Sequence, residues 1–348
     1  MLDDANVLKQ RDPNGALEIA KSQYQQANFQ VNLQNIEHDG RQIYNVVVAG
    51  MGGSALAALM AKSWLKSEFP EPFEIIRTYD LPAYVDKDTL VIVSSYSGNT
   101  EEARSCLDQA ESKGAQVAII SSGGKLVEHA QQNQTAFALL PSGMQPRMAV
   151  IYSLRSLVAL LANFKLISSD KLDEISEKSE WLQKESLNWA SDVPTNDNYA
   201  KQLALQAVGK TAVFYGGTLT APLAYKWKIS FNENAKNVAF WNELPEFDHN
   251  EFIGWSSHPV EKPYAVFDIV SSYEHPRILK RFEISDRLLS GLRPKSTVIN
   301  LVGESVIEQL LWGCILADFV SIYVAILNNV NPVPVQLIEK LKIELAQI

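Results

Sequence analysis

Residues 44–54 read YNVVVAGMGGS and run into an Ala-, Leu- and Met-rich helical pattern that continues through Leu65. A short β-branched run that ends in glycine predicts a buried strand, and the glycines predict a tight turn into a helix. The unit recurs at residues 89–113, where TLVIVSS precedes YSGNT and a helical pattern, and further strands are expected at residues 73–77 and 116–120. Continuous apolar strands that alternate with helices are typical of a parallel sheet covered on both faces.

The second half of the chain repeats this arrangement. Its three expected strands are residues 211–217 (TAVFYGG), 264–273 (YAVFDIVSSY) and 297–302 (TVINLV). We therefore expect an α/β protein with two three-layer αβα domains and mainly parallel sheets. The expected division is a first domain over residues 1–160, a helical linker over 161–196 and a second domain over 197–348.

Charge and cysteine content argue against several classes of protein. The chain of 348 residues has 31 Lys and Arg against 40 Asp and Glu, so its net charge is −9. This balance argues against a general binder of nucleic acid or of anionic membranes, although a local group of backbone N–H donors can still bind a small anion. Cys106 and Cys314 are far apart and belong to no CxxC or Cys/His pattern, so neither a disulfide framework nor a structural zinc site is expected.

The longest apolar stretch, residues 310–327, contains Gly313, Asp318 and Ser321. These interruptions favour a buried helix over a membrane span. The first residues, MLDDANVLKQRDPNG, lack the basic and apolar regions of a signal peptide. We expect a soluble cytoplasmic protein.

Two turns at expected strand ends combine glycine with hydroxyl side chains. Gly52, Gly53 and Ser54 form the first turn, and the second, residues 94–102 (SSYSGNTEE), contains the hydroxyl residues Ser95, Ser97 and Thr100. Hydroxyls and free N–H groups at the positive end of a helix form a phosphate site without Lys or Arg. A bland alternative is that the glycines permit close packing and one hydroxyl caps a helix. Capping a helix needs only one hydroxyl, whereas this turn contains several, so phosphate binding is favoured.

Neither turn matches a nucleotide-binding motif. The first lacks the third glycine of GxGxxG at its place, no acidic residue follows at the expected distance, and GxxxxGK[ST] is absent. GGSA at residues 52–55 and SSYSGNTEE at 94–102 instead resemble the signature of sugar isomerase (SIS) domains, which bind phosphosugars. Two SIS domains in tandem are similar to the phosphoglucose isomerase superfamily.

Further motifs are similar to the bifunctional phosphoglucose/phosphomannose isomerases within that superfamily. They are Pro146-Arg147 before a helix with Tyr152, FNENAK at 231–236, ELPEFDHNE at 243–251, and a C-terminal Pro-x-Pro with a helix. The resemblance implies metal-free, cofactor-free interconversion of glucose or mannose 6-phosphate with fructose 6-phosphate through a cis-enediol(ate).

The resemblance also implies the roles of four side chains. Glu233 would be the base that moves a proton between carbons 1 and 2, and Arg147 would stabilise the enediolate charge. His249 would open the sugar ring and would reach the site from the partner subunit of a homodimer. A lysine of the last helix would assist there, with Lys342 favoured over Lys340. Each has a bland alternative, such as a solvated glutamate, a surface histidine or lysines at a helix end.

The second domain departs from the phosphate-binding pattern. Residues 271–277 read SSYEHPR, so Glu274, His275 and Pro276 replace the Ser-Gly-Asn-Thr turn. A carboxylate there would repel phosphate, so we expect one phosphate site per chain. Two other functions fit a phosphosugar-binding chain. A non-catalytic SIS-domain sensor would leave Glu233 and His249 unused, and an amidotransferase would need a glutaminase domain that this sequence lacks.

Overall fold

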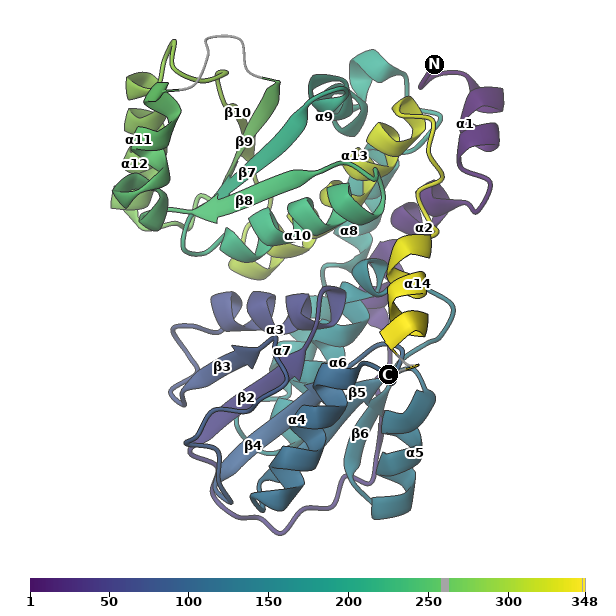
Figure 1. The fold of residues 1–348 in the computed structure, drawn as a ribbon, viewed down its shortest axis with the longest axis vertical. Coiled ribbons are helices and arrows are strands. Elements are labelled where there is room, and N and C mark those ends of the chain that lie inside the picture. The colour runs from purple at the N-terminus through teal and green to yellow at the C-terminus, as the bar shows by residue number, and fades with distance from the viewer. Residues whose placement is uncertain (258–262, 346, 348) are drawn as a thin grey trace.

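The computed structural model describes residues 1–257, 263–345 and 347 (Figure 1). Its first sheet has six strands in the order β1-β6-β5-β4-β2-β3, and only β1, at the edge, is antiparallel to its neighbour. The expected strands at β2, β3, β4 and β5 are confirmed, whereas β1 and β6 are additional. The strands are β1 (Asn32–Gln34), β2 (Asn45–Gly50), β3 (Phe73–Ile76), β4 (Thr89–Ser94), β5 (Gln116–Ser121) and β6 (Ala136–Leu139).

Both faces of this sheet are covered by helices, as the unbroken apolar strands predict. Val46 and Val48 of β2 face one layer, formed by α3 (Gly53–Trp64) and α6 (Val150–Asn163). Val47 and Ala49 face the other layer, formed by α4 (Glu101–Ser112) and α5 (Gly124–Asn133). Successive side chains of a strand point to opposite faces, so one short segment fills both cores. The three-layer αβα arrangement is therefore confirmed for the first domain.

The second sheet has four parallel strands in the order β10-β9-β7-β8. The side of the sheet toward the first domain is covered by α9, α10 and α13, and the other side mainly by α12 and the short helix α11 (Figure 1). These elements are β7 (Thr211–Gly216), β8 (Ala239–Glu243), β9 (Tyr264–Val270), β10 (Thr297–Asn300), α9 (Tyr199–Ala207), α10 (Ala221–Glu233), α11 (Glu251–Gly254), α12 (Pro276–Leu288) and α13 (Val306–Leu327).

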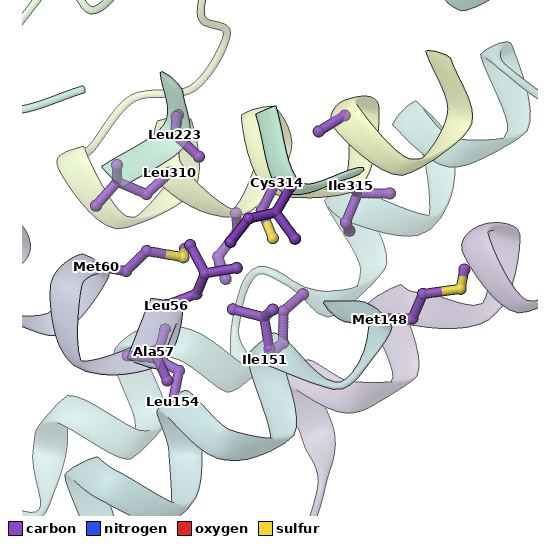
Figure 2. Close-up of a cluster of buried hydrophobic side chains, with 14 of the residues drawn as sticks. Leu56, Ala57, Met60, Met148, Ile151, Leu154, Leu223, Leu310, Cys314 and Ile315 are labelled. Atoms are coloured by element: carbon purple, nitrogen blue, oxygen red, sulfur yellow. The ribbon is translucent and has the colours of Figure 1, made fainter. Parts of the chain in front are cut away.

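The two sheets share one continuous core. Leu56 and Met60 of α3 and Ile151 of α6 meet Leu223 of α10 and Cys314 of α13 (Figure 2). All of these side chains are almost fully excluded from solvent. The long apolar helix α13 is long enough to cross a membrane by length and composition, but 94% of its most apolar window is buried inside the protein. It is therefore a core helix, as its polar interruptions predict.

The N-terminal segment and the helices between α6 and α9 pack around α13. Arg11 of α1 donates a hydrogen bond from Nη1 to the carbonyl of Ile326 at 2.7 Å. Between α6 and α9, Ser179 donates from Oγ to the carbonyl of Tyr24 at 3.0 Å. The segment between α13 and α14 then returns toward the first domain (Figure 1). The elements are α1 (Ala5–Arg11), α2 (Ala16–Ser22), the 3₁₀ helix η1 (Gln23–Asn28), α7 (Asp170–Ser176), α8 (Ser179–Asn188), the 3₁₀ helix η3 (Thr195–Asp197) and α14 (Gln336–Leu345).

Candidate functional site

A buried arginine of the first domain meets a glutamate of the second. Arg147 lies in the 3₁₀ helix η2 (Pro146–Met148), and Glu233 is the last residue of α10. The distance from Arg147 Nη1 to Glu233 Oε2 is 2.9 Å. The arginine side chain is fully buried, whereas 24% of the glutamate side chain is exposed. The carboxylate is therefore held by a fixed cation on one side and is reachable by a small molecule on the other.

Every N–H group of the Arg147 guanidinium has an acceptor within the protein. Nε donates to Asn234 Oδ1 at 2.5 Å, and Nη1 donates to Gln145 Oε1 at 3.2 Å as well as to Glu233. Nη2 donates to the carbonyls of Pro332–Val333 at 2.9 and 3.1 Å. Since a guanidinium has five N–H donors, none remains free for another molecule. Arg147 therefore acts on the pocket through its charge and by holding Glu233, rather than by a direct hydrogen bond to a substrate.

A pocket of about 540 Å³ opens beside this ion pair. Glu233 and Lys236 line it from the second domain, and Leu337 and Ile338 line it from the first turn of α14. Its size is in the range of small-molecule sites. The Lys236 ammonium donates to the carbonyls of Glu233 and Pro332 at 2.8 and 3.1 Å. Desolvation and the charge of Arg147 lower the pKa of Lys236 to about 8, against the opposite effect of Glu233.

The hydroxyl-rich turn lies at the carboxyl end of β4. The Ser95 and Thr100 hydroxyls are 2.8 Å apart, and Ser97 Oγ accepts a hydrogen bond from the N–H of Asn99 at 3.3 Å. Thr100 is the N-cap residue of α4, but its side chain makes no capping hydrogen bond. The simple capping alternative therefore does not explain this threonine. Its hydroxyl lies with a second hydroxyl at the positive end of a helix, as a phosphate site requires.

The glycine turn connects the hydroxyl-rich turn to Arg147. Ser54 Oγ accepts a hydrogen bond from the N–H of Tyr96 at 3.1 Å, which joins the turns after β2 and β4. Gly52, just before α3, has a φ of +51°. At Gly53, an added Cβ would lie 2.7 Å from the backbone N of Arg147, so only glycine permits this close approach. The structure thus brings the predicted phosphate turn and Arg147 together through the start of α3.

The corresponding turn of the second domain contains a buried carboxylate. Glu274 Oε1 accepts hydrogen bonds from the N–H groups of Leu219 and Thr220 at 2.7 and 3.1 Å, at the start of α10. Desolvation raises the pKa of Glu274 despite these bonds. The sheet register pairs Gly216 with Ile269, whereas Gly50 pairs with Ser94. Counted from the partner of that glycine, the second-domain Ser-Ser-Tyr segment therefore begins two residues later than its counterpart in the first domain.

His249 and Glu233 lie toward opposite ends of the same strand. β8 begins six residues after Glu233 and ends six residues before His249, which is the last residue of the 3₁₀ helix η4 (Glu246–His249). A five-residue strand alone spans about 16 Å. His249 is exposed, and the described residues form no hydrogen bond with its side chain. Within one chain the structure does not bring it to the Arg147–Glu233 pair.

Lys342 and Lys340 both lie on α14, whose described side chains are all exposed. Ile338 of this helix lines the pocket. Gln336 and Leu337 line it as well, so Lys340 lies four and three residues after lining residues, just as Lys342 lies four residues after Ile338. Helix spacing therefore does not distinguish the two lysines, and neither of them lines the pocket. In the parts of the chain described by the structure, no three His, Cys, Asp or Glu side chains gather in a way that could hold a metal ion.

Comparison with known proteins places this geometry in a family. A sequence model of the SIS domain matches residues 41–163, and one for the bacterial phospho-glucose isomerase C-terminal SIS domain matches residues 196–345. The bifunctional phosphoglucose/phosphomannose isomerase of Caldicellulosiruptor bescii is 36% identical over 92% of this chain and 94% of that protein. This chain belongs to the bifunctional phosphoglucose/phosphomannose isomerase family. The member from Aquifex aeolicus is 32% identical over 91% of this chain and 95% of its own length.

A relative that is named for a different enzyme activity is also similar to part of this chain. The D-glucosamine-6-phosphate 4-epimerase of Sulfolobus acidocaldarius is 33% identical over 60% of this chain and 63% of its own length. Among solved structures, a glucose-6-phosphate isomerase-like protein from Thermus thermophilus superposes with a TM-score of 0.64 at 17% identity, over 98% of both chains. That likeness concerns the fold alone, and it agrees with the two SIS domains of the bifunctional isomerase family.

The sequence analysis did not single out several groups that lie around Glu233. Asn234 holds Arg147, Lys236 lines the pocket, and the Pro332–Val333 carbonyls accept from the guanidinium. Asn234 and Lys236 stand in the quoted motif FNENAK, so that motif was the available signal. The two carbonyls belong to the quoted Pro-x-Pro motif at residues 332–334, although a backbone carbonyl itself leaves no side-chain signal.

Proposed function

We propose that this protein interconverts glucose 6-phosphate or mannose 6-phosphate with fructose 6-phosphate. The names of the full-length relatives support these substrates. The observation on which the proposal depends is the Arg147–Glu233 ion pair, in which Glu233 lines a pocket of about 540 Å³ and Arg147 closely approaches Gly53 in the turn after β2. The Ser54–Tyr96 hydrogen bond joins that turn to the hydroxyl-rich turn, so the possible base is linked through Arg147 to groups suited to an anionic tail, and these groups lie outside the lining of the pocket at Glu233.

Glu233 is the proposed base. In the aldose-to-ketose direction, its carboxylate takes the proton from carbon 2, and the bonding electrons form the C1–C2 double bond of a cis-enediolate. The carboxylic acid then returns the proton to carbon 1, while the proton of the carbon 2 hydroxyl passes to the oxyanion on carbon 1, so that carbon 2 becomes the ketone and carbon 1 carries a hydroxyl. Glucose and mannose 6-phosphates give the same enediolate, so one pocket serves both. The positive charges of Arg147 and Lys236 favour the anionic intermediate.

The substrate phosphate is proposed to bind at the first domain. Gly52, Gly53 and Ser54 would contribute from the turn after β2, and Ser95, Ser97 and Thr100 would contribute from the turn after β4. The pairing of Ser95 with Thr100, without a helix cap, supports this assignment. Glu274 occupies the amide groups of the second domain's turn, which supports a single phosphate site in each chain.

Ring opening is proposed to involve His249 and Lys342. His249 is exposed, and β8 separates it from Glu233 of the same chain. This separation supports a role for His249 in the site of a second subunit. We therefore propose a homodimer with two shared sites, in which the imidazole transfers a proton to or from the ring oxygen. Lys342 is the lysine proposed near that region, because α14 contributes its first turn to the pocket and the family resemblance favours Lys342 over Lys340.

We propose that the two domains contribute different groups to the site. Residues 1–160 form the phosphate-binding domain, residues 161–196 the helical linker, and residues 197–348 the domain that supplies Glu233 and His249. The family models, which match residues 41–163 and 196–345, support this division. A cytoplasmic location is proposed because both cysteines are free and buried.

The decisive experiment is incubation with fructose 6-phosphate in deuterated water. Glucose and mannose 6-phosphates, both labelled at carbon 2, are the expected products. Failure to turn over the ketose would refute the isomerase proposal and favour a phosphosugar-binding protein. The reaction should also continue after dialysis against a chelator, since the proposed steps use only side chains. Loss of activity that zinc restores would contradict the metal-free mechanism.

A further inference from the structure

A fully buried ion pair lies behind Arg147, away from the pocket. Lys226 of α10 and Asp318 of α13 approach to 2.7 Å between Nζ and Oδ1, and neither side chain is exposed. Asp318 stands in a helix that is otherwise almost entirely apolar. Burial of two charges is costly, and a well-packed apolar pair often stabilises a protein as well or better. The contacts of the pair indicate a role beyond joining two helices.

One branch from this pair holds the backbone of Arg147. Lys226 Nζ donates a second hydrogen bond to the carbonyl of Arg147 at 2.6 Å. Asp318 Oδ1 also accepts from Ser230 Oγ at 2.9 Å, and its Oδ2 accepts from Gln23 Nε2 at 2.8 Å. Both carboxylate oxygens are therefore fixed, and so is the ammonium between Asp318 and Arg147. The backbone of the arginine cannot shift without breaking a charge-assisted bond.

A second branch holds the guanidinium. Ser321 Oγ donates to the Asp318 carbonyl at 3.0 Å and accepts from Asn234 Nδ2 at 2.9 Å. Asn234 Oδ1 in turn accepts from Arg147 Nε. The first branch passes through the Asp318 carboxylate and Lys226 to the backbone of Arg147, whereas the second starts at the backbone carbonyl of Asp318 and ends on the guanidinium. Only the first branch therefore depends on the ion pair. The far side of the same guanidinium holds Glu233.

We propose that Lys226 and Asp318 are positioning residues for the isomerisation. They fix Arg147, and Arg147 fixes the carboxylate of Glu233 toward the pocket; this inference rests on the proposed function. Neither residue touches the pocket, so their effect passes through Arg147. A base displaced by a fraction of an ångström from its substrate proton loses much of its rate, whereas binding at the phosphate turn is unaffected. Loss of either residue is therefore expected to lower kcat and to leave KM nearly unchanged.

The test compares Lys226→Met with Lys201→Met. Lys201 is a matched control, because it too is fully buried in the second half of the chain and donates to Asp3, Ser191 and Val193 at 2.7–3.0 Å. With fructose 6-phosphate, Lys226→Met is expected to lower kcat about ten- to a hundredfold and to change KM less than about twofold. Lys201→Met should lose stability in urea with an unchanged kcat. Equal effects of both variants on kcat would overturn the proposal.

A double-mutant cycle separates positioning from general destabilisation. In an Arg147→Ala background, Lys226→Met should have little further effect on kcat, because the residue through which it acts is gone. Full additivity of the two effects would also overturn the proposal. If Lys226→Met does not fold, Asp318→Asn, which keeps the shape of the side chain, is compared in the same way. Wild-type protein without turnover would refute the proposed function, whereas active wild type with an unimpaired Lys226→Met would refute only the positioning role.

Discussion

Arg147 Nη1 and Glu233 Oε2 lie 2.9 Å apart although the two residues are separated by 86 positions in the sequence. The contact joins the segment before α6 in the first domain to the end of α10 in the second. Met148, the residue after Arg147, belongs to the core that the helices of the two domains share (Figure 2). Relative movement of the two halves would break this pair, so the interface between the domains determines where the carboxylate lies.

Replacement of Glu233 by glutamine tests the base directly. The amide keeps the size of the side chain but cannot accept a carbon-bound proton. We expect Glu233→Gln to lower kcat by roughly 100- to 10,000-fold and to leave the affinity for fructose 6-phosphate nearly unchanged. Turnover and calorimetric binding are measured on the same preparations. The exposed Glu180→Gln on α8 is the control, and wild-type turnover by Glu233→Gln would exclude this residue as the base.

Mixing two inactive variants tests whether the site is shared between subunits. His249→Ala and Glu233→Gln should each be nearly inactive alone. In a mixed dimer, one of the two sites combines an intact Glu233 with an intact His249 of the other subunit. Random exchange should therefore restore about a quarter of the wild-type activity. Activity that stays at the level of the separate variants after confirmed subunit exchange would mean that the two residues act within one chain, or not at all.

The pattern of apolar residues and glycines predicted those strands whose own sequence favours an extended conformation. The apolar strands β2, β4, β5, β7 and β9 are confirmed, because β-branched runs between glycine turns have few other stable conformations. The short strands β6 (AFAL) and β8 (AFWNE) have no such run, and they form because a neighbouring strand pairs with them. Tertiary pairing of this kind leaves no periodic signal.

The candidate site divides in the same way. Ser95 and Thr100 stand in one turn, so their proximity could be predicted from the spacing. The bonds from Arg147 to the Pro332–Val333 carbonyls could not, because they depend on where the chain returns after α13. These bonds use N–H groups that could otherwise have donated to an oxyanion. The role of Arg147 stays a prediction, and the geometry favours an effect through its charge and through the position of Glu233.

Removal of two hydroxyls tests the phosphate turn. Ser97→Ala combined with Thr100→Ala deletes one exposed hydroxyl and one partner of the Ser95–Thr100 pair. We expect weaker binding of fructose 6-phosphate, about tenfold or more, because each hydroxyl would donate to the phosphate. Ser112→Ala, at the other end of α4, is the matched control. Unchanged affinity in the double variant, measured by calorimetry, would place the phosphate elsewhere.

The buried carboxylate of Glu274 should make stability depend on pH. Desolvation raises its pKa in the folded protein, so the folded state binds this proton more readily than the unfolded chain. Its contribution to the free energy of unfolding is therefore complete below the unfolded pKa and is lost as pH rises through the folded pKa. Glu274→Gln removes the titration. The stability of the wild type relative to Glu274→Gln, from urea denaturation between about pH 4 and 8, should fall with rising pH. A difference that is constant or rises with pH would contradict this.

Lys236 should limit activity on the alkaline side. Its pKa is lowered to about 8 by desolvation and by the charge of Arg147, so its ammonium loses its proton as pH rises through that value. The pocket then loses a positive charge that favours the enediolate, and kcat/KM for fructose 6-phosphate should decline above about pH 8. Lys236→Arg keeps its charge to much higher pH, so in this variant the decline should move to higher pH or disappear. Lys210→Arg, an exposed residue outside the pocket, should keep the wild-type profile. An identical alkaline limb in wild type and Lys236→Arg would show that another group titrates there.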